Sequence, residues 1–297
     1  MRIALATCDV VPAEFDDDER LAEALRRRGA SVEFASWDAA GVEWDGFDLV
    51  VVRSTWDYTS RPEEFVSWAR SIGGRLQNAP ELLAWNADKR YVADLETAGL
   101  AVVPTVFVEP GEPAPALEGE VVVKPTVSAG GRDTGRFGPG AHDEARGLLG
   151  RLSEQGRVAM VQPYLEAVDD RGETALVYVA GEIAHTLHKR AVLAPDEVAP
   201  LRDDALGAAE AMYDPDLVSA GESSAAEREL AGAILDHLAE RFGGVPLYAR
   251  VDLVPGPTGG PVLLELEAIE PYLYMTTNPA TAERLADAIV ADVEGAV

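Results

Sequence analysis

The first third of the chain alternates short apolar runs with amphipathic segments, a pattern typical of a parallel sheet covered by helices. Apolar runs predict strands at residues 2–7, 31–35 and 48–52. Between the first two, four acids at 16–19 and a run of arginines before Gly29 suit the helix dipole and predict a helix that ends there. The run at 48–52 is typical of a strand buried on both faces. We therefore predict a doubly wound N-terminal lobe.

The remainder of the chain mixes helices with strands arranged as hairpins. Residues 59–100 predict a helix, a turn and a second helix that opens at 85–90 and runs to Ala98. The further elements that the pattern predicts are strands at 102–108, 121–125 and 158–165, a helix at 141–155, a hairpin of 175–179 with 183–188, a helix at 225–242, and a hairpin of 245–254 with 261–267. The predicted fold class is therefore α/β, with α+β lobes after the N-terminal one.

Lysine is rare in this chain, because only three of its 25 basic residues are lysines. An ammonium is a compact point charge and a guanidinium is a planar fork, so the two exchange on a solvated surface but not in a tight phosphate pocket. Lys124 ends an apolar strand and precedes the glycine-rich stretch 128–135. A lone lysine often survives by chance, but a strand, a lysine and a glycine loop in succession predict a functional Lys124.

The formal charge of −27 argues against a nucleic-acid partner, since phosphate backbones are bound by clustered Lys and Arg. No segment has the unbroken apolar length of a membrane span, and residues 1–8 lack the character of a signal peptide. The single cysteine, Cys8, forms no internal disulfide, so we expect a cytoplasmic protein. A protein this acidic must build a local basic pocket to hold a polyphosphate, which makes its few cations informative.

Residues 53–58 follow the strand at 48–52, at the edge where open α/β sheets place ligands. Arg53 comes directly after the strand, so we expect it to be held rigidly and to point toward a substrate. Trp56 and Tyr58 would then be aromatic walls of the substrate site. A polar loop that carries aromatic lids is the alternative interpretation.

The last predicted hairpin carries three carboxylates. Asp252 lies in its first strand, while Glu265 and Glu267 alternate with Leu264 and Leu266 in its second. The period of two places the glutamates on one face and the leucines in the core. Converging carboxylates repel one another unless cations neutralise them, and Mg²⁺ takes carboxylate and phosphate oxygens as ligands. A solvated acidic face is the alternative, but the lysine-bearing glycine loop favours a metal site.

These motifs together resemble the ATP-grasp superfamily, and its glutathione-synthetase-like branch in particular. The residues that carry the resemblance are, in chain order, Lys89, Lys124, the loop 128–135, the segment 162–165, and Asp252 with Glu265 and Glu267. Further motifs, at 53–58, 85–86, 104–105 and 264–271, are similar to the group that contains the cyclo-ligase of D-cycloserine biosynthesis, which closes O-ureido-D-serine.

The resemblance implies an ATP-grasp fold with three lobes, namely an N-terminal substrate-binding lobe (1–85), a small central ATP-binding lobe (86–163) and a C-terminal ATP-binding lobe with the metal site (164–297). It also implies a cofactor site. Lys89 and Lys124 would neutralise the α- and β-phosphates of ATP, and a loop would close over the β- and γ-phosphates through Ser128, Ala129, Gly130 and Gly131. The adenine would lie against Gln162, Pro163, Tyr164 and Leu165, and Glu173 would hold the ribose.

For catalysis, the resemblance implies two Mg²⁺ ions, with Mn²⁺ as an alternative, on Asp252, Glu265 and Glu267. Many relatives have Asn at the last position, which leaves the number of metals open. Lys189, Arg190 and Arg250 would neutralise the γ-phosphate and the substrate carboxylate. The residues expected to take part in catalysis are Lys124, Lys189, Arg250 and Arg53.

The reaction implied is ADP-forming ligation of a carboxylate to an amine through an acylphosphate. We expect a small amino-acid-like carboxylate substrate and no nucleic-acid or membrane partner, and we leave a homodimer open. The runner-up is an intermolecular amide or peptide ligase, and a non-catalytic nucleotide-binding protein is a more distant alternative. A nicotinamide-dependent oxidoreductase would need a glycine fingerprint after the first strand, which residues 7–12 lack.

Overall fold

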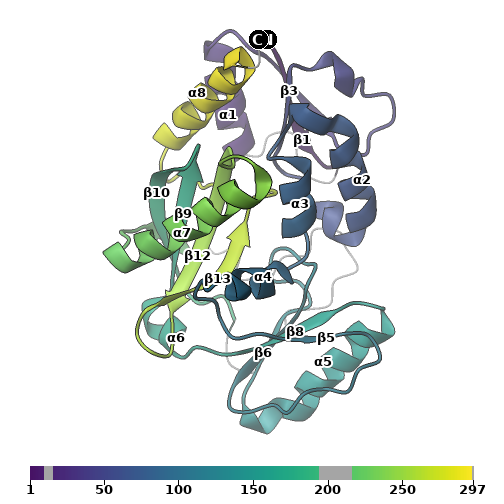
Figure 1. Cartoon of the computed structure of the whole chain (residues 1–297), viewed down its shortest axis with the longest axis vertical. Helices are drawn as coiled ribbons and strands as arrows, with labels where there is room; N and C mark the ends of the chain where they lie inside the picture. The colour runs from purple at the N-terminus through teal and green to yellow at the C-terminus, as the bar shows by residue number, and fades with distance from the viewer. Residues whose placement is uncertain (10–15, 194–215, 296–297) are drawn as a thin grey trace.

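The computed structural model describes residues 1–9, 16–193 and 216–295, which form three β-sheets with helices packed around them (Figure 1). Each sheet comes from a separate stretch of the chain. The first is built from residues 2–77, the second from 106–163 and the third from 173–267.

The N-terminal sheet is parallel throughout, with strand order β2-β1-β3-β4. Its strands are β1 (Arg2–Thr7), β2 (Ser31–Ser36), β3 (Leu49–Val52) and β4 (Leu76–Gln77). Side chains alternate between its two faces. Ile3 and Leu5 pack with helices α1 (Asp16–Arg27) and α8 (Ala280–Gly295), whereas Ala4 and Ala6 pack with α2 (Pro62–Ile72). The predicted doubly wound lobe is therefore confirmed.

The central sheet is antiparallel and smaller, and it lies at the bottom of Figure 1. Its order is β5 (Val106–Val108), β8 (Ala159–Pro163), β6 (Val121–Pro125) and β7 (Gly135–Phe137). Helix α5 (His142–Glu154) buries Leu148 and Leu152 against it. The predicted strand at 102–108 starts only at Val106, because Pro104 has no amide hydrogen to donate to a ladder.

The C-terminal sheet has the order β11-β10-β9-β12-β13 and is antiparallel. Its strands are β9 (Glu173–Val179), β10 (Glu182–Lys189), β11 (Val218–Ala220), β12 (Tyr248–Pro255) and β13 (Pro261–Glu267), and the short helix α6 (Ala167–Arg171) precedes them. Helix α7 (Ala225–Phe242) covers one face. A capping box of Ser224 with Glu227 starts this helix, and Gly243 in the left-handed region ends it.

The single helix predicted over 85–98 is wrong, because the structure has two helices, α3 (Pro80–Asn86) and α4 (Tyr91–Thr97), with a break between them. The break is held by contacts to the segment after β6 and to the end of β13. The Lys89 amide donates to the Thr126 carbonyl at 2.8 Å. The Asn86 side chain donates to the Leu266 carbonyl at 2.9 Å and accepts from the Ala268 amide at 2.8 Å. These contacts bring Lys89 beside the glycine loop.

Helix α8 has no counterpart among the predicted elements, and it joins the N- and C-terminal lobes. Its Leu285 and Ile289 share one apolar cluster with Leu21 of α1 and Val177 of β9. The Tyr248 hydroxyl adds a polar link, since it lies 2.6 Å from the Val52 carbonyl and 2.9 Å from the Ile269 carbonyl. Helix α8 packs against residues of both the N-terminal and the C-terminal sheet, so the packing does not mark where one lobe ends. The lobe boundaries at 85 and 163 therefore stay predictions. None of the described helices is long and apolar enough to cross a membrane.

Candidate active site

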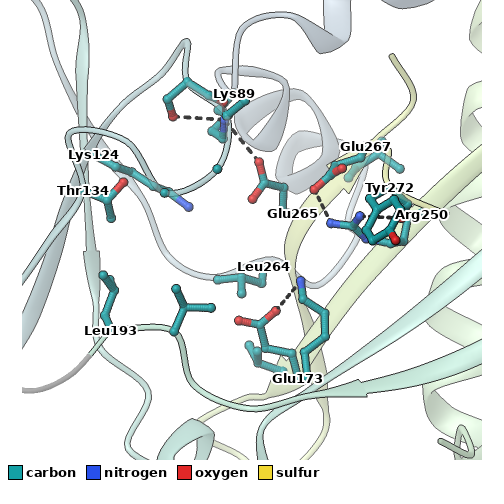
Figure 2. A pocket seen from close by; sticks show the side chains of 18 of the residues that line it. Lys89, Lys124, Thr134, Glu173, Leu193, Arg250, Leu264, Glu265, Glu267 and Tyr272 are labelled. Carbon is teal, nitrogen blue, oxygen red and sulfur yellow. Dashed lines mark hydrogen bonds and ion pairs between the residues drawn. The ribbon is translucent and has the colours of Figure 1, made fainter. Parts of the chain in front are cut away.

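A cavity of about 800 Å³ lies where the three lobes meet (Figure 2). Most of the side chains predicted for the site line it. They are Lys89, Lys124, Ser128, Ala129, Gly130, Gly131, Gln162, Pro163, Tyr164, Leu165, Glu173, Lys189, Arg250, Glu265 and Glu267. Two predicted residues, Asp252 and Arg53, do not line it.

Lys89 lies between the central lobe and the metal-site strand. Its Nζ donates to the Ser128 carbonyl at 2.5 Å and forms an ion pair with Glu265 Oε1 at 3.2 Å. Burial opposes ionisation of Glu265, but Lys89 and Lys124 outweigh it and lower the pKa of this carboxylate. Lys89 therefore joins the glycine loop to an ionised Glu265 across the cavity (Figure 2).

Lys124 is the cavity lysine whose charge is not paired. It is buried at the end of β6, and within the described residues its ammonium makes neither a hydrogen bond nor an ion pair. Burial lowers its pKa, Glu265 acts in the opposite direction, and Lys89 adds to the lowering. An ammonium in this position is suited to an incoming anion, because no protein carboxylate has to be displaced first.

The glycine loop turns back over Lys124. Gly130 and Gly131 have φ angles of 63° and 71°, in the left-handed region that favours glycine. The Ser128 carbonyl is held by Lys89, which ties the start of the loop to the break between α3 and α4. The backbone of the loop can therefore approach a ligand closely, as phosphate-binding loops require.

An apolar wall faces the glycine loop. Leu165, just after β8, packs with Val103, Val168 and Val254, and all four line the cavity. Gln162 is buried and donates from Nε2 to Thr105 Oγ1 at 2.9 Å, so its side chain is used within the protein. The wall is suited to a flat apolar ring.

Two cations neutralise the acids at the C-terminal side of the cavity. Lys189 Nζ lies 2.9 Å from Glu173 Oε2 and 2.8 Å from Asp252 Oδ2. The Arg250 guanidinium binds both oxygens of Asp252 and also contacts Glu267. Burial would raise the pKa of Asp252, but Arg250 and Lys189 lower it. Asp252 is fully buried beneath these two cations, which explains why it does not reach the cavity surface.

The predicted alternation along the last strand is wrong at one position. A bulge between Asp252 and Leu253 pairs Asp252 with Glu265 but Leu253 with Leu263. Leu264 is therefore the extra residue, and it lines the cavity instead of entering the core. Glu265 and Glu267 keep their common face, with Leu266 buried between them.

Only part of the predicted metal site is preformed. Among the described residues, no three acidic, histidine or cysteine side chains are grouped closely enough to hold a metal ion. Glu265 and Glu267 fit such an ion, since both line the cavity and offer carboxylate oxygens, the ligands that Mg²⁺ takes. Burial, opposed by Arg250 and reinforced by Asp252, raises the pKa of Glu267 to about 7. A divalent cation there would compensate that charge.

The direct role predicted for Arg53 needs correction, because its side chain is sealed behind the cavity. Arg53 Nε donates to Asp18 Oδ1 at 3.0 Å, and Nη2 donates to the Pro271 carbonyl at 3.2 Å. Asp17, beside Asp18, accepts the backbone amides of Leu273 at 3.0 Å and Met275 at 2.7 Å. We call Asp17, Asp18 and Arg53 the brace, since they fasten the segment after β13 to the N-terminal lobe.

Several cavity residues carried no predicted role. The segment after β13 supplies Glu270, Tyr272, Tyr274, Thr276 and Thr277, and it faces the expected aromatic walls, Trp56 and Tyr58. The available signal was a cluster of aromatic residues directly after the acidic strand, at 271–274. Helix acids are usually solvated, so no sequence signal indicated that Asp17 and Asp18 are buried.

Comparisons with known proteins agree with this architecture. Residues 3–78 match the family model described as the N-terminal domain of D-cycloserine synthetase DcsG. The chain is 35% identical over 304 residues to the cycloserine biosynthesis protein DcsG of Streptomyces lavendulae, with 97% of each chain covered. A crystal structure of D-cycloserine synthetase DcsG superposes with a TM-score of 0.85 at 32% identity, covering 99% of this chain and 100% of that one.

More distant structures share the fold. A D-alanine–D-alanine ligase from Bacillus anthracis, solved with ATP, gives a TM-score of 0.67 at 13% identity and covers 100% of this chain and 98% of its own. The ATP-grasp ligase PsnB, solved with a minimal precursor, Mg and ADP, gives 0.60 at 16% identity, with 98% of each chain covered. At these identities the likeness concerns the fold alone, and it confirms the predicted ATP-grasp fold.

Proposed function

Because the chain belongs to the D-cycloserine synthetase DcsG family of ATP-grasp ligases, we propose that it activates the carboxylate of a small amino acid with ATP and closes that molecule into a ring. The proposed substrate is O-ureido-D-serine or a close analogue. The observation that carries the proposal is Lys124, a buried ammonium that none of the described carboxylates pairs with, facing a cavity that also presents the glycine loop and two glutamates.

In the proposed complex, the triphosphate lies along Lys89, Lys124 and the glycine loop. The substrate carboxylate and the γ-phosphate are both anions, so catalysis rests on positioning them and neutralising their charge. Lys189 and Arg250 lie at the opposite side of the cavity, where they balance the acids and can turn toward the reacting groups. The adenine would occupy the apolar wall around Leu165, and the ribose would lie near Glu173.

Glu265 and Glu267 are the proposed metal ligands, and Asp252 would join them only by releasing Lys189 or Arg250. A bound Mg²⁺ would supply positive charge to the phosphates. The carboxylate oxygen of the substrate attacks the γ-phosphorus and ADP leaves. A nitrogen of the same molecule then attacks the acyl carbon, phosphate leaves, and the nitrogen loses its proton to complete an amide. Ring closure is favoured because both reacting ends belong to one bound molecule.

The proposal is tested by ADP release with O-ureido-D-serine as the only carboxylate, together with mass analysis of the product. We expect ADP, phosphate and a cyclic product in equal amounts. Release of ADP only when a separate acid and amine are supplied together would replace cyclisation by intermolecular ligation. In parallel, calorimetry should show that ATP binding weakens strongly in excess chelator, because the acidic cavity needs the charge of the metal.

A further inference from the structure

The substrate side of the cavity contains one acid whose charge the protein does not balance. Among the cavity-lining acids, Glu173 is paired with Lys189, Glu265 with Lys89, and Glu267 with Arg250. In the described part of the chain, the carboxylate of Glu270 has no ion pair and no hydrogen bond to another residue. Glu270 is thus the acidic counterpart of Lys124, since within the described residues neither side chain has an ion pair.

The backbone around Glu270 is fixed from the N-terminal lobe. Trp56 donates from its indole nitrogen to the Glu270 carbonyl at 3.2 Å. The next carbonyl, that of Pro271, is bound by Arg53, and the proline ring restricts its own φ angle. These two hydrogen bonds fix the backbone of residues 270 and 271, so the position of the Glu270 side chain in the cavity is fixed as well.

The surroundings of Glu270 favour a ligand with positive charge. Burial, reinforced by the nearby charge of Glu267 and opposed by that of Lys89, raises the pKa of Glu270 to about 8. The ionised form of Glu270 is therefore disfavoured in the free cavity, and a bound cation would stabilise it. Trp56, Tyr58, Tyr272 and Tyr274 line the same cavity, and aromatic faces attract ammonium groups. A small ammonium with three N–H donors matches both features.

An amino acid also provides the second charge that the cavity requires. Its ammonium and its carboxylate are attached to one carbon, so a negative and a positive subsite must be neighbours. Lys89 is close enough to Glu270 to influence its ionisation, and Lys89 lies beside the unpaired Lys124. The substrate carboxylate can therefore face the lysines and the ATP phosphates while its ammonium faces Glu270.

We infer that Glu270 binds the ammonium group of the amino-acid substrate and selects α-amino acids over carboxylic acids that lack this group. The inference rests on the proposed function, because it assumes that the activated carboxylate belongs to a small amino acid. It assigns Glu270 to recognition of the substrate and gives it no part in the transfer of the phosphoryl group.

The decisive quantity is the ratio of kcat/KM for O-ureido-D-serine to kcat/KM for its analogue with hydrogen in place of the ammonium. A charge-assisted hydrogen bond corresponds to a preference of about 10- to 150-fold in the wild type. Glu270→Gln should reduce this ratio to below about 5, whereas Glu270→Asp should keep a large part of it because the charge remains. Glu118→Gln, which removes an exposed acid that does not line the cavity, should leave the ratio unchanged.

Two outcomes would overturn the inference while the proposed function stands. One is a wild type that uses both compounds equally well. The other is a Glu270→Gln variant that loses kcat for both compounds with the ratio intact, which would indicate a proton-transfer or purely structural role. A wild type that is inactive on O-ureido-D-serine would overturn the proposed substrate alone. In that event, calorimetry measures the affinities for D-serine and for 3-hydroxypropanoate, which lacks the ammonium. If Glu270 binds the ammonium, the wild type binds D-serine more tightly and Glu270→Gln loses this difference.

Discussion

Two groups of buried charge lie within one molecule and differ in what surrounds them. The brace of Asp17, Asp18 and Arg53 is closed, because its charges face each other and the backbone of the segment after β13. The cavity group, with Lys124 and Glu270 as its unpaired members, is open to an 800 Å³ space. Burial and charge alone therefore do not distinguish a structural residue from one that meets a ligand.

Accessibility makes the distinction. Arg53 Nη1 has no hydrogen-bond partner among the residues that the structure describes, but it is sealed from solvent and cannot reach a ligand. Lys124 also lacks a hydrogen-bond or ion-pair partner in the described part of the chain, yet it lines the cavity. We therefore expect substitutions in the brace to act chiefly on stability, and substitutions at Lys124 to act chiefly on activity.

The largest effect is expected for Arg53→Ala. Removing the guanidinium leaves Asp18 buried without its cation, which should lower the free energy of unfolding by about 3–5 kcal/mol in chemical denaturation. The double variant Asp18→Ala/Arg53→Ala should recover part of this loss, because Asp18 is no longer left as a buried carboxylate without its cation. An Arg53→Ala protein with wild-type stability and a greatly raised KM for the amino acid would show instead that Arg53 contacts the substrate.

Lys124→Arg should produce the next largest effect, and it should fall on activity. A planar guanidinium does not fit a site for a point charge, so kcat/KM for ATP should fall. The expected loss of transition-state stabilisation is about 2–4 kcal/mol, by analogy with the loss of one oxyanion donor. Stability should not fall in Lys124→Met, because burial already disfavours the ionised lysine. Lys189→Met is the contrasting control, since it leaves Glu173 and Asp252 buried without their lysine and should destabilise the protein. Near-normal turnover by Lys124→Arg would contradict the phosphate role.

The sequence predicted the features of this fold that local patterns determine. The buried strand at 49–52 and the helix that ends before Gly29 are examples, since periodicity and capping specify them. The break between α3 and α4 could not be predicted in this way, because contacts of Asn86 and Lys89 with distant carbonyls fix it. The bulge that turns Leu264 into the cavity likewise depends on pairing between β12 and β13.

The candidate site shows the same division. The scarcity of lysine makes Lys89 and Lys124 conspicuous in the sequence, and both line the cavity. For Arg53 the position at a strand end is predicted correctly, but a strand end does not reveal which way a side chain turns. Its true neighbour, Asp18, lies 35 residues earlier in the chain, and that contact depends on the packing of α1.

A third kind of group, partly buried and outside the cavity, predicts a pH effect of intermediate size. His185 Nδ1 lies 2.7 Å from Thr281 Oγ1, its Nε2 has no hydrogen-bond partner within the described ranges, and burial lowers its pKa to about 4. The unfolded chain therefore binds the proton more readily, and stability should be lost as the pH falls from about 6.5 toward 4. His185 is partly exposed, so we expect about 1–2 kcal/mol at pH 5 after allowing for screening.

The wild type alone cannot isolate this effect, because the raised pKa values of Glu267, Glu270 and Asp17 act in the opposite direction. The difference in unfolding free energy between wild type and His185→Gln, measured at pH 7.5 and at pH 5, isolates it. That difference should shift in favour of the variant at pH 5. An unchanged difference would show that His185 is as easily protonated in the folded protein as in the unfolded chain.

The smallest effect is expected from two matched glycine substitutions, one in the cavity lining and one outside it. Gly130 has φ 63° in the loop over Lys124, and Gly259 has φ 89° in the turn between β12 and β13, where a Cβ would meet nothing within 4 Å. Alanine at either position should cost roughly 1 kcal/mol of stability, because both backbones are left-handed. Only Gly130→Ala should also raise KM for ATP, by about fivefold, since its Cβ would stand where the loop backbone approaches the phosphates. If both variants lose stability equally and neither changes KM for ATP, the backbone at Gly130 does not approach the phosphates. The contrast between the closed brace and the open cavity would then apply to side chains alone.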